Sequence, residues 1–257
     1  MSKRLFFIIF CTTLSLFVQG QPVKYTIANV HAHNDYDHNI PFTQAYGLQL
    51  GSIEADVLWI NDTLFVAHGA KYLKREVLFE SSYLQKLDRF VKERNGYAYE
   101  DTTAVLQLLI DIKTDSLQTL NAVLKSIQKF PRLVNRSVRF VITGNQLPAD
   151  QFNLYPSYIL FDGKINDPSH IKNLNRIGLF SADFSKYSKW KGEGEIPAAD
   201  LALLKMDIAK VHELHKQIRF WGVPDNANTW RNMMNLGVDY INTDQIAEVA
   251  KFVAASK

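Results

Sequence analysis

Hydrophobic and polar positions follow two different periods along this chain. Short apolar runs rich in β-branched residues alternate with longer segments in which apolar residues recur at helical spacing. This alternation is typical of βα units arranged around a parallel sheet. The pattern predicts eight strands, at residues 26–30, 52–57, 105–112, 138–142, 158–161, 178–182, 218–221 and 238–242.

The segments between these runs predict amphipathic helices. Eight strands with intervening helices indicate the α/β class and a single TIM-type (β/α)8 barrel. The stretch 147–175 has weak periodicity, so the middle units are expected to be irregular. The helices are predicted at residues 82–94, 116–129, 197–216, 227–236 and 245–255.

One segment departs from this rhythm directly after the second predicted strand. In residues 59–68 the turn-forming pair Asn61-Asp62 lies between apolar residues, which predicts a small β-hairpin. Such a hairpin would return His68 toward the end of the second strand.

The first twenty residues have the features of a secretory signal peptide. Lys3 and Arg4 precede an apolar run at 5–18, and the small residue Gly20 lies near the expected cleavage point. A transmembrane anchor is the alternative, but the run is short of the roughly 20 residues needed to cross a bilayer. We therefore expect a secreted or periplasmic protein with no stable membrane span after cleavage and one domain at residues 21–257.

Charge and cysteine content exclude several functional classes. The formal net charge is +3, and removal of Lys3 and Arg4 leaves +1 (3 − 2). This balance predicts neither a nucleic-acid surface nor a polybasic membrane patch. The single cysteine, Cys11, lies within the predicted signal peptide, so no disulfide framework is expected in the mature chain.

Two carboxylates mark the second predicted strand. Glu54 and Asp56 are separated by one residue, so strand alternation directs both side chains to the same face. Two unpaired anions are unfavourable in a buried strand. A divalent cation between them is the simplest explanation, and oxygen ligands suit Mg²⁺ or Ca²⁺.

The third predicted strand ends with a similar alternation. Asp111 and Lys113 lie on one face at the strand end, where TIM-type barrels carry their active sites. Asp111 would supply a third carboxylate, and Lys113 would neutralise a phosphate oxygen as a compact positive charge. A purely structural Asp–Lys pair is the alternative interpretation.

Histidines flank the carboxylates on both sides. His31 and His33 precede the second strand and His68 follows it. A His-x-His pair also opens zinc-dependent PHP-like and amidohydrolase-like enzymes. Such sites need further histidines at middle strand ends, which this chain lacks. We therefore expect His31 and His68 to act as general base and general acid beside a hard cation.

Six short segments follow one another over nearly all of the predicted mature chain: HAHNDY at 31–36, SIEADV at 52–57, VAH at 66–68, IDIK at 110–113, RFWGVPD at 219–225 and GVDYINTD at 237–244. Together they resemble the phospholipase-C-like phosphodiesterase superfamily, and especially its altered-inheritance-of-mitochondria group.

The resemblance implies a TIM-type barrel that hydrolyses a small-molecule or lipid phosphodiester with one Mg²⁺ or Ca²⁺ ion. By this resemblance Glu54, Asp56 and Asp111 are the expected metal ligands, His31 and His68 the acid and base, and Lys113 a phosphate contact. His33, Asn34 and Trp221 are expected to contact the substrate. The His-Arg-Gly and Pro-Glu-Asn-Thr segments usual in glycerophosphodiesterases are absent, and a catalytically silent barrel that binds head groups is a further alternative.

Overall fold

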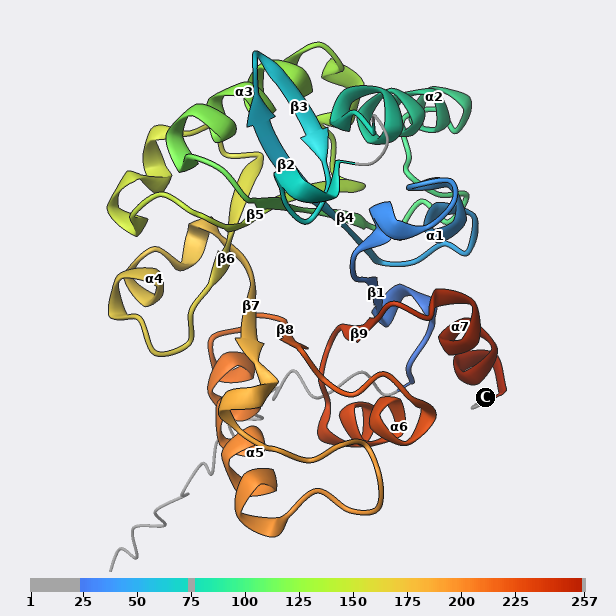
Figure 1. The fold of residues 1–257 in the computed structure, drawn as a ribbon, viewed down its shortest axis with the longest axis vertical. Helices are drawn as coiled ribbons and strands as arrows, with labels where there is room; N and C mark the ends of the chain where they lie inside the picture. Colours follow the sequence, from blue (N-terminus) through green and yellow to red (C-terminus); the bar gives the residue numbers. More distant parts are fainter. Residues whose placement is uncertain (1–23, 74–76, 256–257) are drawn as a thin grey trace, which may run out of the picture.

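Eight parallel strands form a nearly closed ring in the computed structural model, which describes residues 24–73 and 77–255 (Figure 1). Their order around the ring is β8-β7-β6-β5-β4-β2-β1-β9. A bridge between Arg219 and Tyr240 links the two ends. The strands are β1 (Val30–Ala32), β2 (Ser52–Ile60), β4 (Leu106–Ile112), β5 (Val138–Gly144), β6 (Ile159–Gly163), β7 (Ile177–Asp183), β8 (Ile218–Trp221) and β9 (Ile241–Thr243).

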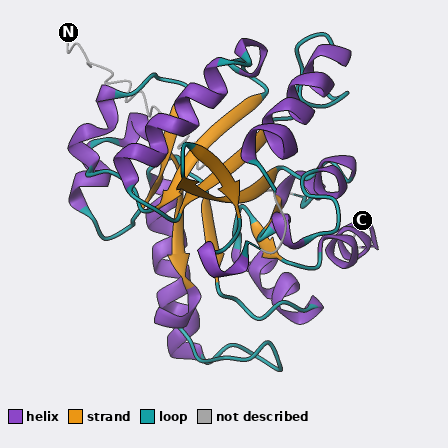
Figure 2. Cartoon of the chain, turned by 45° about the horizontal axis from the view of Figure 1, so that its top comes forward, coloured by secondary structure: helices purple, strands orange, loops and turns teal. Residues whose placement is uncertain are grey.

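Helices surround the strands on the outside (Figure 2). Their apolar faces pack against the outward-facing side chains of the strands and form the main core. The predicted TIM-type barrel is confirmed. The α-helices are α1 (Thr43–Gly47), α2 (Gln85–Glu93), α3 (Ser116–Gln128), α4 (Pro168–Lys172), α5 (Ala198–Glu213), α6 (Ala227–Leu236) and α7 (Ile246–Ala255).

The predicted first strand was placed too early. Residues Ile27–Asn29 form a 3₁₀ turn, and β1 begins only at Val30. The Thr26 hydroxyl accepts a hydrogen bond from Ala28 N, while the Asn29 side chain accepts one from Thr26 N. This reciprocal capping stabilises the turn in place of an extended segment. Because the true strand starts later, it carries His31 at its centre rather than beyond its end.

The predicted hairpin is present. Strand β2 continues to Ile60 and pairs antiparallel with β3 (Thr63–Val66). Asn61 and Asp62 both have positive φ, 46° and 58°, as two-residue hairpin turns require. After the hairpin, Ala67 N donates to Asp56 O at 3.1 Å. The hairpin therefore returns the chain to the strand that carries the carboxylates.

The middle βα units are reduced, as the weak periodicity predicts. Between β5 and β6 the chain forms only a 3₁₀ segment at Ala149–Leu154. Between β6 and β7 it forms the five-residue helix α4. These short connections leave the barrel complete, because β5, β6 and β7 still pair in parallel, with one shift of register between Phe161 and Asp162.

The interior of the barrel has an apolar floor and a polar upper layer. Leu109, Val141, Leu179 and Tyr240 form a small buried cluster separate from the outer core. Two residues further along β4, strand alternation returns to the interior at Asp111, whose Cα pairs with that of Asp56 on β2. The carboxylates thus gather at the carboxyl ends of the strands, above this apolar cluster.

Residues 1–23, which include the predicted signal peptide, lie outside the described residues. Within ranges 24–73 and 77–255, every helix is too short or too polar to cross a membrane.

Candidate active site

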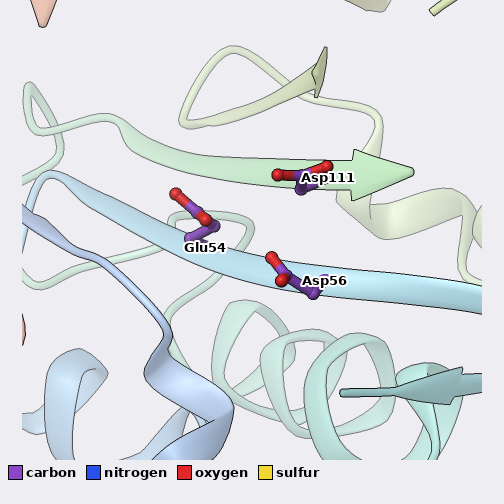
Figure 3. Close-up of side chains that lie close together, drawn as sticks. All are labelled: Glu54, Asp56 and Asp111. Carbon is purple, nitrogen blue, oxygen red and sulfur yellow. The ribbon is translucent and has the colours of Figure 1, made fainter. Parts of the chain in front are cut away.

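Three carboxylates converge at the carboxyl end of the barrel. Glu54 and Asp56 project from β2 and Asp111 from the neighbouring β4 (Figure 3). One oxygen from each lies within 4.8 Å of the others, and all three are buried or nearly so. The sequence prediction that these residues share one face is therefore confirmed, and β4 supplies the third carboxylate.

Lys113 partly neutralises this cluster. Its Nζ lies 2.9 Å from Asp56 Oδ2 and 2.8 Å from Asp111 Oδ2. The other oxygens, Asp56 Oδ1 and Asp111 Oδ1, are buried and have no hydrogen-bond partner. Buried carboxylate oxygens without partners are costly. Three hard oxygen donors with two unsatisfied atoms fit a divalent cation such as Mg²⁺ or Ca²⁺.

The pKa shifts of the cluster show an excess of negative charge. Burial, then the charges of Glu54 and Asp111, raise the pKa of Asp56 to about 7, although Lys113 opposes the shift. Burial also raises the pKa of Asp111. Burial would lower the pKa of Lys113, but its two aspartates outweigh that effect and raise it. One ammonium group therefore does not neutralise both aspartates.

Glu54 has a separate cationic partner. Arg219 Nη1 donates to Glu54 Oε2 at 2.7 Å, and both side chains are almost completely buried. Burial alone would raise the pKa of Glu54, but Arg219 and then His31 hold it well below the usual range. Arg219 also donates to Ser181 Oγ at 3.2 Å, so the guanidinium connects β2 to β7 across the barrel. Glu54 is thus ionised and fixed in position.

His31 is fully buried next to this ion pair. Its Nε2 lies 2.5 Å from Arg219 Nη1, and its Nδ1 lies 2.7 Å from Ser52 Oγ. The same Nε2 also lies 2.8 Å from Glu54 Oε2, so His31 contacts both members of the ion pair. Burial, then the charge of Arg219, lower the pKa of His31 to about 4. His31 is a neutral residue that positions Arg219 and is absent from the pocket lining.

His33 is more accessible and lines the pocket. Its Nδ1 lies 2.8 Å from Asp244 Oδ1, and its Nε2 lies 4.0 Å from Glu54 Oε1, beyond hydrogen-bond distance. Burial would lower the pKa of His33, but the hydrogen bond to Asp244 and the charge of Glu54 raise it. Asp225 in turn positions Asp244, because its Oδ2 accepts from Asp244 N at 2.8 Å. His33 and Asp244 thus form a histidine–carboxylate pair that Asp225 keeps in position at the carboxyl end of the barrel.

His68 approaches the carboxylates from the opposite side. Its Nδ1 lies 3.2 Å from Asp56 Oδ2, while 63% of its side chain is exposed. The same Asp56 oxygen is 2.8 Å from the hydroxyl of Tyr36, which also lies 2.7 Å from Asn34 Oδ1. Asn34 adopts a left-handed conformation with φ 48°. This turn after β1 directs both Asn34 and Tyr36 toward the second strand.

A pocket of about 480 Å³ opens over these groups. It brings together seven of the nine residues that the sequence singled out; His31 and Asp56 are buried beneath it. The predicted substrate contacts Asn34 and Trp221 line it, and Trp221 is 42% exposed. Residues to which the sequence assigned no role also line it: Thr143, Asp162, Lys164, Ser181 and Arg219.

Some of these additional lining residues could have been found from their position at the ends of predicted strands. Thr143 and Asp162 each stand at the end of a predicted strand, as Asp244 does. Position at a strand end indicates access to the site, but it does not distinguish among roles. Arg219 lies inside a predicted strand, and a single cation in an apolar run gives no indication of its partner.

Comparison with known proteins places this geometry in a family. Residues 23–145 match the AIM6-like phosphodiesterase domain, and residues 217–246 match the glycerophosphoryl diester phosphodiesterase family. The two matches contain both predicted catalytic histidines and all three carboxylates, together with Arg219 and Trp221 at the opposite side of the barrel.

Curated relatives agree with these matches. Altered inheritance of mitochondria protein 6 from Eremothecium gossypii is 26% identical over 272 residues, covering 88% of this chain and 69% of that protein. A homolog from Arthroderma benhamiae is 26% identical over 254 residues, covering 84% and 81%. The crystal structure of a glycerophosphodiester phosphodiesterase from Parabacteroides distasonis shares the fold, with a TM-score of 0.58, 13% identity and coverage of 92% and 99%. These similarities agree with the predicted resemblance to the phospholipase-C-like phosphodiesterase superfamily and to its altered-inheritance-of-mitochondria group.

Proposed function

We propose that this protein is a phosphoric diester hydrolase that uses one divalent cation, Mg²⁺ or Ca²⁺. The observation that carries the proposal is the convergence of Glu54, Asp56 and Asp111 with two unpartnered buried oxygens under an open pocket. The predicted signal peptide alone supports the further proposal that the reaction takes place outside the cytoplasm.

The three carboxylates would hold the cation, which when bound supplies positive charge to phosphate oxygens. Lys113 faces the same pocket and adds a second positive charge next to Asp56 and Asp111. Arg219 keeps Glu54 ionised and so keeps one ligand permanently charged. These residues together favour the extra negative charge that develops on a phosphodiester during displacement.

Proton transfer is assigned to the two histidines that face the pocket. His33, oriented by Asp244, removes the proton from the attacking hydroxyl of water or of the substrate itself. His68, oriented by Asp56, donates a proton to the leaving oxygen. The sequence assigned the first role to His31, but its burial and its contact with Arg219 favour His33 and leave His31 as a positioning residue.

The zinc-dependent alternative has less support. It requires His31 as a metal ligand, yet Nε2 of His31 contacts the Arg219–Glu54 ion pair and Nδ1 contacts Ser52. Among the residues described, the group able to hold a metal contains carboxylates only. A hard cation bound by oxygen is therefore the better interpretation.

A phosphodiester panel assayed with Mg²⁺, Ca²⁺ and chelator tests the proposal. We expect turnover that chelator abolishes and that Asp111→Asn lowers at least a hundredfold, because one charged ligand is lost. Asp88→Asn is the matched control. Asp88 is also a buried carboxylate in an ion pair, but it lies on α2 outside the pocket and its partner is Arg132. Undiminished activity in chelator would refute the mechanism. Binding of the phosphodiesters without turnover would favour a catalytically inactive barrel that binds head groups.

The pH profile separates the two candidate bases. Asp244→Asn removes the carboxylate that raises the pKa of His33, so the acidic limb of kcat/KM should shift to lower pH. A neutral His33→Gln variant should be nearly inactive and still folded. If His33→Gln keeps full activity, the base is another group.

A further inference from the structure

A second hollow adjoins the catalytic pocket over the ends of β6, β7 and β8. It has a volume of about 520 Å³ and shares three lining residues with the catalytic pocket, namely Lys164, Ser181 and Trp221. Its outer wall is α5, which lies beside β8 (Figure 1). The two hollows therefore adjoin at these three residues, next to the carboxylates.

The wall formed by α5 carries two exposed apolar side chains. Its core-facing residues include Leu204, Ile208 and Val211, as the helix period requires. Leu203 and Met206, one turn apart on another face, are 46% and 59% exposed and line the hollow. With Trp221 they are three of the eight exposed large hydrophobic side chains in the described residues, and all three border this one hollow.

The acidic groups of the hollow are already engaged. Asp207 Oδ2 accepts from the hydroxyl of Tyr187 at 2.5 Å, and Asp183 Oδ1 accepts from Ser185 N at 2.9 Å. The opposite wall is held in place by Lys210 of α5, whose Nζ donates to Ile165 O at 3.0 Å. Lys164 and Lys186 also line the hollow, and their stems add apolar surface while their ammonium groups stay able to meet an anion or water. The groove therefore combines the apolar side chains of α5 and Trp221 with two lysines beside the charged site.

We propose that this groove, lined by Leu203, Met206 and Trp221, binds the apolar chain of the substrate. The inference rests on the proposed function and narrows it to a phosphodiester in which one esterified alcohol carries a long hydrocarbon chain. The phosphate lies over Asp111 and Lys113, and the chain leaves past Trp221 along α5. A glycerophosphodiester without a chain would leave the groove filled with water, and would gain nothing from its apolar area.

A chain-length series tests the proposal. The substrates are glycerophosphocholine and lysophosphatidylcholines of six to twelve carbons, each assayed as monomers below its micelle concentration. We expect kcat/KM to rise about twofold for each added methylene group, because a chain in an open groove buries only part of its surface. A flat series would overturn the proposal.

The variant Met206→Glu tests whether the dependence of kcat/KM on chain length arises in this groove. A charge in the groove should lower kcat/KM for the twelve-carbon substrate about tenfold or more and leave that for glycerophosphocholine unchanged. Leu154→Glu is the control, because Leu154 is 79% exposed outside this groove. An equal loss on both substrates in a folded Met206→Glu protein would contradict the inference.

A binding assay keeps this inference separate from catalysis. If no substrate is turned over, the proposed function fails, and titration with monomeric dodecylphosphocholine then decides the groove. Weaker binding of dodecylphosphocholine by Met206→Glu than by the wild type supports the groove. Equal dissociation constants would overturn it.

Discussion

Replacement of Arg219 by methionine isolates the buried ion pair at the centre of the site. Arg219 and Glu54 have side chains that are 5% and 4% exposed, and their charged atoms are 2.7 Å apart. Methionine keeps much of the side-chain volume and removes the positive charge. Glu54 is then a buried carboxylate without its main cationic partner, because Lys113 contacts the two aspartates instead.

The expected loss follows from the cost of an uncompensated buried charge. Breaking a buried pair in this way costs about 3 to 5 kcal/mol of unfolding free energy. For a domain of this size that corresponds to a decrease in Tm of roughly 10 °C. The measurement is urea and thermal unfolding at pH 8 in chelator, where His31 stays neutral and cannot replace the missing charge.

Added divalent cation should stabilise Arg219→Met more than the wild type. In the variant a cation at the three carboxylates also compensates Glu54, and stabilisation by a ligand grows with its affinity for the folded state. Arg176→Met is the matched control, because Arg176 is equally buried but donates only to the backbone carbonyls of Tyr155, Pro156 and Ile159. A loss under about 1 kcal/mol, or an equal response of Arg219→Met and the wild type to cation, would refute the reasoning.

Two further substitutions probe the walls of the site. Gly144→Ala should lower the unfolding free energy by about 2 kcal/mol or more, because Gly144 has φ +74° and an added Cβ would lie 1.9 Å from Asp111 Oδ1. It should also weaken cation binding in calorimetry. Unchanged stability would mean that Asp111 moves freely. Burial, more than any neighbour, raises the pKa of Asp162 to about 6 in the folded protein. The contribution of this raised pKa to the unfolding free energy is fully present below the unfolded pKa near 4 and is lost as the pH rises through 6. About 1.5 kcal/mol of it is lost between pH 5 and 8. In urea unfolding at the two pH values, the wild type should lose about 1.5 kcal/mol more unfolding free energy than Asp162→Asn, in which the other titrating groups remain. Equal losses in the two proteins would contradict this prediction.

Local patterns determined much of this protein. Strand alternation is a property of two neighbouring peptide units, so the shared face of Glu54 and Asp56 follows from their spacing alone. The same holds for the hairpin at Asn61-Asp62, whose turn geometry depends on those two residues. Alternating strand and helix periods were sufficient to predict the barrel, and the strand-end rule then indicated where its polar residues collect.

Only the tertiary structure decided which charges and histidines work together. Glu54 and Arg219 are 165 positions apart, and His33 and Asp244 are 211 apart, so no local pattern relates either pair. Closure of the barrel brings them together across its interior.

His31 within β1 and His33 directly after it show why the roles of the histidines depend on the tertiary structure. His31 and His33 are two residues apart and so share a face, which alternation predicts. Their height along the barrel axis depends on strand register: His31 pairs with Ser52, which places His33 level with Glu54. His31 is therefore enclosed beside Arg219, whereas His33 lies one layer higher and lines the pocket. Register is a property of paired strands, so the sequence of one strand determines the direction of a side chain and the assembled barrel determines its depth.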